Sequence, residues 1–274
     1  MATFLFYDIE TTGLNKSFDQ VIQFAAIRTD LNLQEIERIE LLVKLNADTV
    51  PSPYAFATHQ VALSELEQGL NETEAMIIIH QWLNVPGTIS LGYNTLGFDD
   101  EFLRFSFYRN LLTVYTHQYA NQCSRMDLYP VVAMYFLYCQ DALLWPKLND
   151  EFTLKLAHIN AHNALSEGQA HTAIVDVEAT LALAKKLMHH KEMWHYICGY
   201  FKKTIDKRRC EILPVHIHSQ DVAHVCGLLV DGIFGAKHTY HSPVIFLGEH
   251  LTYKNQGLWP VSYTHLTLPT KRIV

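Results

Sequence analysis

Short apolar and aromatic segments near the start of the chain predict three strands. They read TFLFYDI over residues 3–9, VIQFAAIRTD over 21–30 and IELLVKL over 39–45. Residues that favour strands dominate all three, and the turn-rich stretch TTGLNKSFDQ separates the first two. The spacing predicts antiparallel neighbours joined by hairpin-like connections.

After these strands the apolar spacing changes to that of helices, interrupted by one more strand. Residues 73–84 predict a helix capped by Asn71 or Thr73, and 88–94 predict a buried strand. Helical spacing also marks 98–112, 126–139 and 170–190. Antiparallel strands followed by alternating helices and strands predict an α/β domain, with a mixed sheet flanked by helices, over residues 1–200.

The rest of the chain has a different character. Residues 201–211 carry five Lys or Arg and predict a boundary helix or linker, and a glycine-containing β-rich stretch follows. We expect a linker and an incomplete small β domain over residues 201–260. The last residues, VSYTHLTLPTKRIV, resemble the translation of a sequencing adapter. We therefore expect 261–274 to be non-native and the natural protein to continue further.

Composition favours a soluble intracellular protein. The chain has 274 residues, of which 49% are hydrophobic and 18% charged, so it can form a sizeable core. No apolar run reaches the ~18 residues of a membrane span, and no basic region precedes a secretory segment, so a cytoplasmic location is expected. Five cysteines without a C-x-x-C pair argue against a disulfide framework or zinc ribbon.

The net charge of −7 is unevenly distributed. Residues 1–200 hold 12 Lys and Arg against 23 Asp and Glu, whereas 201–274 hold 9 against 5. An acidic first segment argues against general nucleic-acid binding by charge, but it suits a site where carboxylates surround cations.

Three short motifs supply candidate chemistry. In the first, Asp8 and Glu10 are two residues apart at the end of a strand, so their side chains lie on the same face. In the second, NTLGFD places Asp99 at a helix start, and in the third, HTAIVD contains His171 and Asp176. Five helical steps separate these last two by about 140°, so they share a site only if His171 lies on the helix entry.

Each motif alone is weak, but together they point to one site. Four carboxylates that converge at a sheet edge offer hard oxygen ligands for Mg²⁺ or Mn²⁺. Two such ions can support phosphodiester hydrolysis, and a histidine with a pKa near neutrality can accept the proton of the attacking water.

These motifs resemble those of the DEDDh 3′–5′ exonucleases, which have the ribonuclease H-like fold. The segments QFAAIRTD, LGYNTLGFDDEFLRFSFYRN and SRMDL further resemble the bacterial exodeoxyribonuclease I subfamily. The similarity covers roughly residues 3–200, with a weaker match in FGAKHTYHSP. It implies a metal-dependent enzyme of DNA repair and recombination that releases 5′-mononucleotides from the 3′ end of single-stranded DNA.

The resemblance also implies roles for individual residues. Asp8, Glu10, Asp99 and Asp176 would hold two Mg²⁺ ions, replaceable by Mn²⁺, and His171 would be the general base. Further substrate contacts are implied for a set of residues in which Lys155 stands where arginine is usual and Tyr119 where tryptophan is expected. That set is Glu10, Thr11, Leu14, Arg104, Tyr115, Tyr119 and Lys155.

Family resemblance extends to partners and to the later domain. It implies an SH3-like domain after residue 200 and binding to single-stranded-DNA-binding protein through a site that we expect to be incomplete here. We expect a monomer that does not associate with membranes. Two alternatives stay open: a DEDDh exonuclease for RNA ends or polymerase proofreading, and an inactive nucleic-acid-binding module of the same fold.

Other groups of histidines and basic residues are not interpreted as functional sites. His158 and His162 lie four residues apart but lack a third ligand at a sensible spacing, and His189 and His190 are interpreted as solvated or edge residues. The basic residues of 201–211 favour a solvated helix face, with DNA contact as the alternative.

Overall fold

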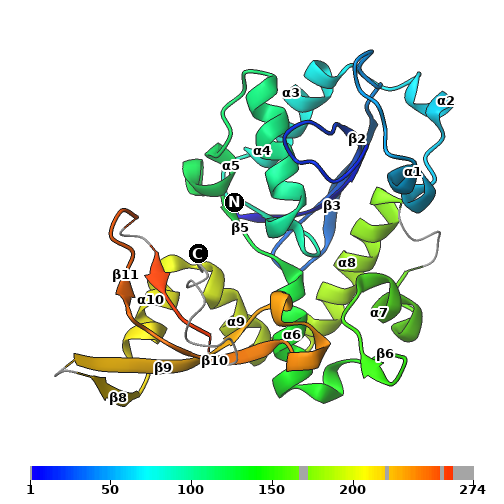
Figure 1. Cartoon of the computed structure of the whole chain (residues 1–274). Helices are drawn as coiled ribbons and strands as arrows, with labels where there is room; N and C mark the ends of the chain where they lie inside the picture. The colour runs from blue at the N-terminus through cyan, green and yellow to red at the C-terminus, as the bar shows by residue number, and fades with distance from the viewer. Residues whose placement is uncertain (1, 167–171, 220–221, 254–255, 262–274) are drawn as a thin grey trace.

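A five-stranded mixed sheet in the order β3-β2-β1-β4-β5 forms the centre of the molecule (Figure 1). The computed structural model describes residues 2–166, 172–219, 222–253 and 256–261. β2 pairs antiparallel with β1 and β3, whereas β4 runs parallel to β1 and to β5, so the predicted mixed sheet is confirmed. The strands are β1 (Thr3–Thr11), β2 (Val21–Thr29), β3 (Glu35–Leu42), β4 (Thr88–Leu91) and β5 (Ser124–Arg125).

The described part of the chain contains ten α-helices. The predicted cap is confirmed at Asn71, whose side chain accepts a hydrogen bond from the backbone of Glu74. The helices are α1 (Pro53–His59), α2 (Leu63–Leu66), α3 (Glu72–Leu83), α4 (Asp99–Arg109), α5 (Thr116–Tyr119), α6 (Leu128–Tyr138), α7 (Leu156–Asn163), α8 (Ala173–Met188), α9 (Lys191–Cys198) and α10 (Lys203–Glu211).

β1 divides the core between its two faces. Phe4 and Phe6 belong to a buried cluster with residues of α6 and α8, whereas Leu5, Tyr7 and Ile9 belong to a second cluster with α3 and α4. This alternation follows from the two-residue period of a strand. The side chains of residues 8 and 10 therefore continue the face covered by α8.

Some elements differ from the sequence-based expectation. The helix expected to extend to residue 190 ends at Met188, and α9 begins separately at Lys191. β3 begins at Glu35 rather than at residue 39. Its first half is a charged edge strand without an apolar pattern, so the sequence pattern did not predict it. The stretch 201–211 contains the helix α10 from Lys203.

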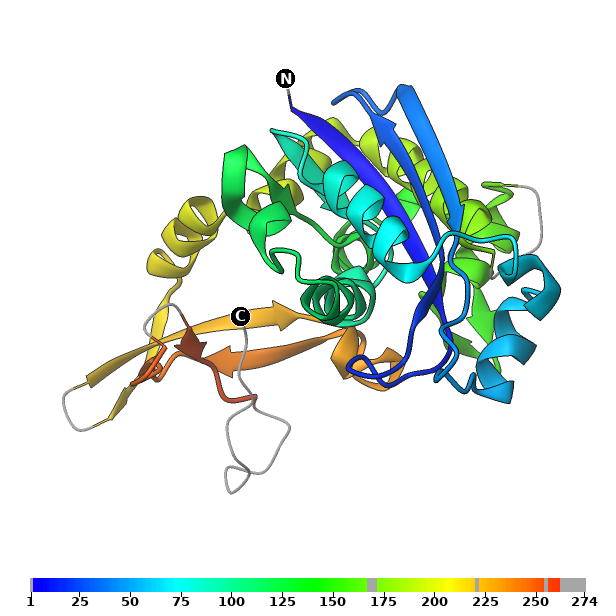
Figure 2. The same cartoon turned by 90° about the horizontal axis from the view of Figure 1, so that it is seen from above.

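A second group of strands lies to one side of the main sheet (Figures 1 and 2). It comprises a three-stranded sheet in the order β10-β9-β8 and the short pair of β11 with β12, whereas the pair of β6 with β7 lies beside α7. The bounds are β6 (Lys147–Leu148), β7 (Glu151–Phe152), β8 (Val215–Ser219), β9 (Val222–Val230), β10 (His241–Ile245), β11 (Gly248–Glu249) and β12 (Gly257–Leu258).

The β-rich segment is joined to the main core through Tyr240. This side chain is buried in the same cluster as α6 and α8, and its hydroxyl donates a 3.2 Å hydrogen bond to the carbonyl of Phe152. Gly232 lies directly against the ring of Tyr129, where a Cβ atom would come within 1.9 Å. The SH3-like assignment and the boundary near residue 200 stay predictions, and residues 262–274 lie outside the described part.

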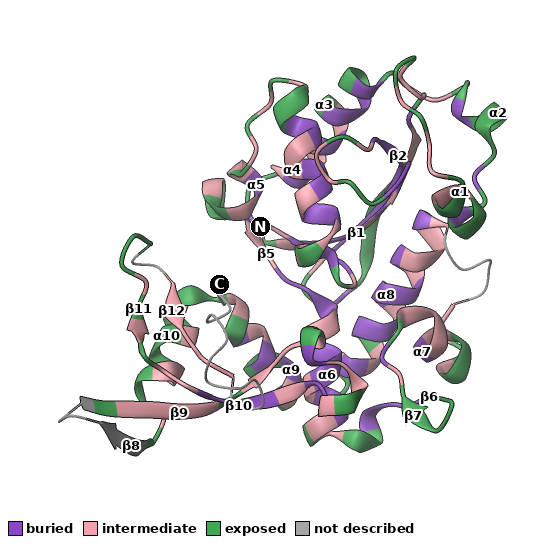
Figure 3. Ribbon diagram, in the orientation of Figure 1, coloured by how far each residue is buried: buried purple, intermediate pink, exposed green. Residues whose placement is uncertain are grey.

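Burial is concentrated where α3, α4, α6 and α8 meet the main sheet. By contrast, α10, β9, β11 and β12 are largely exposed or half-buried (Figure 3). No helix in the described part of the chain combines the length and apolar character needed to cross a membrane.

Candidate active site

Three carboxylates converge at the end of β1. Asp8 and Glu10 lie on its α8-facing side, and Asp176 comes from the first turn of α8. One ligand oxygen from each lies within 4.8 Å of the others. The register of β1 shifts between Glu10 and Thr11, an irregularity of the kind that redirects side chains at a strand end. The expected convergence of these three acids is present.

The start of α8 is held against the neighbouring strand. The backbone N–H of Ala173 donates a 3.4 Å hydrogen bond to Gln23, the residue paired with Glu10 across β1 and β2. Gln23 in turn donates to Glu40 at 2.8 Å. These contacts fix the first turn of α8, and with it Asp176, relative to the strand that carries Asp8 and Glu10.

Burial and mutual repulsion make Asp8 and Glu10 hold their protons strongly. Burial raises the pKa of Asp8 well above its ordinary value, and the charges of Asp99, Glu10 and Asp176 add to this effect. Burial, followed by the charges of Asp176 and Asp99, raises the pKa of Glu10 to about 8. The repulsion between such buried carboxylates is removed when protons or cations neutralise their charges. Their hard oxygen atoms fit Mg²⁺ or Mn²⁺.

Asp99 lies beside this group at the start of α4. It is buried, and its Oδ1 accepts a hydrogen bond from the backbone N–H of Ile9 at 3.2 Å. Burial also raises the pKa of Asp99 well above its ordinary value. Because its charge acts on both Asp8 and Glu10, the fourth predicted acid belongs to the same electrostatic site.

The turn that delivers Asp99 is shaped by Asp127. The Asp127 carboxylate accepts backbone N–H groups of Asn94 at 2.8 Å and Leu96 at 3.1 Å, and it also caps α6 through Tyr129. Asn94 adopts the left-handed conformation with φ of 64°. Asp127 therefore organises the NTLGFD motif, a role that the sequence did not indicate.

Asp100 has a structural rather than a surface role. It is almost fully buried and forms an ion pair with Arg125, while the Tyr7 hydroxyl donates to it at 3.1 Å. Burial favours a raised pKa, but the hydrogen bond from His117 and the charge of Arg125 outweigh it and lower the pKa of Asp100. Arg125 and Asp127 both belong to SRMDL, so this segment supports the site from two sides.

His171 lies outside the described residues. Thr172, which follows it, precedes α8, whose first residue is Ala173. The position of His171 at the helix entry and its catalytic role stay predictions.

The predicted substrate-binding residues divide into separate groups. Thr11 is buried and donates to the carbonyl of Gly13, while Leu14 is exposed on the following loop. Arg104 donates to the Tyr115 hydroxyl at 3.2 Å and pairs with Glu101. Tyr119 is exposed on α5. Lys155 is the N-cap residue of α7.

A groove borders the acid group on the β2–β3 side. Its volume is about 720 Å³, and its lining includes Gln23, Glu40, His59, Glu65 and Thr172. Its size is that of a small-molecule site, but its carboxylates are unfavourable for a phosphate chain.

Comparison with known proteins identifies the family. A family model described as exonuclease matches residues 5–184. The chain belongs to this exonuclease family. Exodeoxyribonuclease I of Haemophilus influenzae is 32% identical over 256 residues, which cover 92% of this chain and 52% of that protein. Exodeoxyribonuclease I of Escherichia coli is 36% identical over 187 residues, covering 67% of this chain and 39% of the relative.

Solved structures of exonuclease I have the same fold. The Escherichia coli enzyme in complex with a dA16 oligonucleotide superposes with a TM-score of 0.85 at 30% identity, covering 95% of this chain and 55% of that one. A product-bound exonuclease I gives a TM-score of 0.88 at 28% identity, covering 100% and 63%. The predicted exonuclease fold and the resemblance to exodeoxyribonuclease I are confirmed. The chain spans about half the length of the curated relatives it matches.

Proposed function

We propose that this chain carries the active site of a metal-dependent 3′–5′ exonuclease that releases 5′-mononucleotides from single-stranded DNA. The observation that supports this most directly is the convergence of Asp8, Glu10 and Asp176 within 4.8 Å, with Asp99 bonded to the backbone of Ile9. The relatives named exodeoxyribonuclease I and the oligonucleotide complex support the choice of substrate.

Mg²⁺ is the cation that we expect, as two ions per site, with Mn²⁺ able to replace it. Asp8, Glu10 and Asp176 would hold the cations, and the neighbouring Asp99 would add its charge to the site. When bound, such a pair supplies Lewis-acid activation of water and stabilisation of the leaving oxygen.

The chain's own residues would carry the proton and position the strand end. His171 would accept the proton of the attacking water, because an imidazole has a pKa near neutrality. Glu10 and Thr11 would bind the terminal nucleotide, and Leu14 would pack against its base as an apolar wedge. The exposed position of Leu14 supports this role.

The strand is proposed to approach along α4 and α5. Arg104 can bind a phosphate, and Tyr115 and Tyr119 offer faces on which any base can stack. The groove beyond Gln23 carries Glu40 and Glu65 instead, which disfavours a phosphate path there. Lys155 would contribute a further cation but, unlike arginine, no bidentate contact.

We infer a monomer that acts in DNA repair, with residues 1–200 as the exonuclease domain and 201–260 as a linker and part of an SH3-like domain. Binding to single-stranded-DNA-binding protein is proposed from the family resemblance alone.

A digestion assay tests the function. Equal amounts of 5′-labelled single-stranded DNA and RNA of the same sequence are incubated with the protein and Mg²⁺, and the products are resolved by length. We expect the DNA to shorten progressively from its 3′ end and the reaction to stop with chelator. Asp8→Asn should abolish shortening, whereas Asp48→Asn, a change at an exposed acid, should not. Preferential RNA shortening, or binding without turnover, would overturn the proposal.

A further inference from the structure

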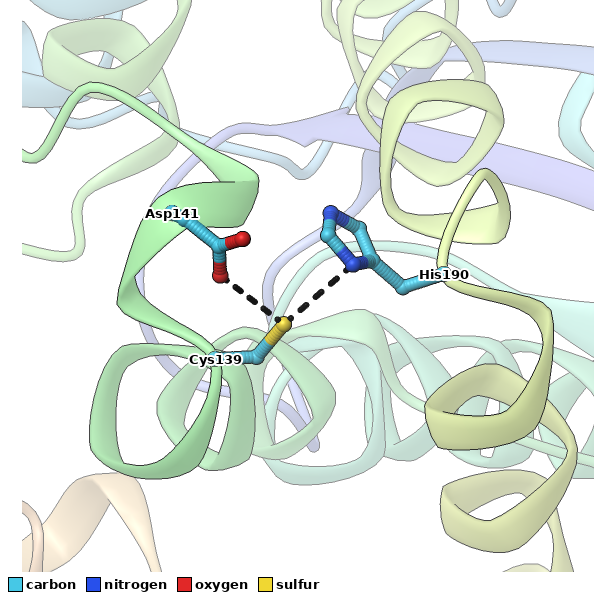
Figure 4. Close-up of side chains that lie close together, drawn as sticks. All are labelled: Cys139, Asp141 and His190. Atoms are coloured by element: carbon cyan, nitrogen blue, oxygen red, sulfur yellow. Dashed lines mark hydrogen bonds between the residues drawn. The ribbon is translucent and has the colours of Figure 1, made fainter.

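A second group of potential metal ligands lies at the other end of α8. Cys139 follows α6, Asp141 lies in the short helical turn Gln140–Ala142, and His190 separates α8 from α9. Figure 4 shows the three side chains pointing toward one another. Cys139 Sγ lies 3.4 Å from Asp141 Oδ1 and 3.5 Å from His190 Nδ1, and all three ligand atoms lie within 4.8 Å of one another.

These distances match the edges of a tetrahedral site. Zinc binds sulfur at about 2.3 Å and nitrogen or oxygen at about 2.0–2.2 Å, so tetrahedral angles separate sulfur from either by ~3.5–3.6 Å. The two observed contacts of Cys139 Sγ agree with this spacing before any rearrangement. A set of one sulfur, one imidazole nitrogen and one carboxylate oxygen suits a borderline cation rather than Mg²⁺.

Tyr135 holds the two half-buried ligands in place. Its hydroxyl donates to the carbonyls of Leu187 at 2.8 Å and His190 at 3.4 Å, and its own carbonyl accepts the backbone N–H of Cys139 at 2.8 Å. Tyr135 is fully buried, so this arrangement is rigid. A preorganised ligand pair loses little conformational freedom when a metal binds. Asp141 is exposed, which leaves a path for an ion and a water ligand.

We propose that Cys139, Asp141 and His190 form a zinc site with water as the fourth ligand. Binding converts the Cys139 thiol to a thiolate and releases its proton to solvent, while His190 binds as neutral imidazole through Nδ1. The ion would link the end of α6 to the α8–α9 junction. It would stabilise the fold without entering the reaction, because Asp176 and His190 are separated by 14 residues, most of them helical, or ~20 Å.

Cobalt distinguishes this site from the carboxylate site. The full chain is treated with chelator and titrated with Co²⁺, and the thiolate-to-cobalt charge-transfer band is recorded. We expect the band to saturate at one equivalent and to disappear when Zn²⁺ is added. Cobalt bound only by Asp8, Glu10 and Asp176 gives no such band, because these ligands contain no sulfur. Absence of the band in the wild type would overturn the proposal.

Variants assign the band to its ligands. Cys139→Ser should remove it, whereas Cys226→Ser, at a half-buried cysteine on β9, should keep it. Zn²⁺ at about 100 times its Kd should raise the wild-type Tm by roughly 5–10 °C more than that of Cys139→Ser. A band of equal strength in Cys139→Ser and Cys226→Ser would refute the assignment. An equal Tm shift in the wild type and Cys139→Ser would refute it as well. Circular dichroism in chelator checks that the variants are folded, and the wild-type titration does not depend on them.

Discussion

The backbone N–H of Ile9 donates a hydrogen bond to the carboxylate of Asp99, across 90 residues of sequence. Ile9 lies between Asp8 and Glu10, and its own side chain packs into the opposite core cluster. The bond therefore fixes the start of α4 against the strand position from which the two acids project. It joins two of the sequence motifs by direct contact rather than by proximity alone.

Replacing Asp8 should separate activity from stability. Asp8→Asn removes a proposed metal ligand, so we expect nuclease activity to fall at least about 100-fold, since even supporting residues of metal sites commonly cost 10–100-fold. The Tm in chelator should not decrease, because asparagine preserves the shape of a carboxyl group whose charged form is disfavoured by burial and by the neighbouring acids. Digestion of labelled DNA and thermal unfolding measure the two effects. A large drop in Tm would instead indicate a structural role for Asp8.

Glu10 should make the metal-free protein less stable as the pH rises. Its pKa is about 8 in the folded chain against an ordinary value of 4.5, so the folded state binds more protons between these values. The free energy of unfolding should therefore fall from about pH 4.5 to 8. Outside that window, Glu10 should cause no further change in it with pH.

Thermal unfolding in chelator from pH 5 to 9 measures this slope. Glu10→Gln should reduce it, and Mg²⁺ should oppose the decline because cations replace the lost protons. An identical slope in wild type and Glu10→Gln would show that Glu10 does not titrate in this way.

Asp127 should act as a positioning residue for Asp99. Asp127→Ala would leave the part-buried N–H groups of Asn94 and Leu96 without this acceptor and remove the cap of α6, at a cost of ~1–3 kcal/mol in the free energy of unfolding. Asp127→Asn retains an acceptor and should cost less. Urea unfolding measures stability, with the exposed Asp48→Ala as a control.

Nuclease assays on the same variants test the positioning. Under conditions where each is fully folded, we expect kcat to decrease in the order wild type, Asp127→Asn, Asp127→Ala. Unchanged kcat in folded Asp127→Ala would restrict Asp127 to a stabilising role.

Tyr119 should contribute to strand binding. Loss of one stacking face in Tyr119→Ala is expected to weaken binding by ~1–3 kcal/mol, or roughly 5- to 150-fold in Kd, while Tyr119→Phe should retain most affinity. Fluorescence anisotropy with labelled oligonucleotide in chelator measures binding without cleavage. The exposed Tyr138→Ala serves as control, and equal losses in both alanine variants would argue against a specific contact.

Local patterns were sufficient to predict the parts of the site that lie within single elements. Strand alternation placed Asp8 and Glu10 on one face, and the helix-start position of Asp99 followed from the strand that precedes it. Convergence on Asp176 could be expected because the motifs resemble a known family, rather than from periodicity alone. His171 and the division into domains remain predictions.

Contacts between distant segments could not be read in the same way. The ion pair between buried Asp100 and half-buried Arg125 depends on how β5 lies beside β4, which no local pattern determines. Cys139 and His190 are separated by 51 residues without any metal-binding spacing, and His190 was interpreted as a solvated or edge residue. A buried tyrosine, Tyr135, brings these segments together, and its two carbonyl partners are visible only in the fold.

The alternation along β1 also determines which genetic changes this gene can tolerate. A conservative substitution at Phe4 or Phe6 alters packing locally and leaves every later side chain on its own face. Deletion of a single codon between residues 3 and 7 would exchange the two faces for the remainder of the strand. Asp8 and Glu10 would then enter the apolar layer beneath α3 and α4, while Tyr7 and Ile9 would face α8. We therefore expect variation among descendants of this gene to include replacements within β1 but to lack single-residue insertions or deletions there.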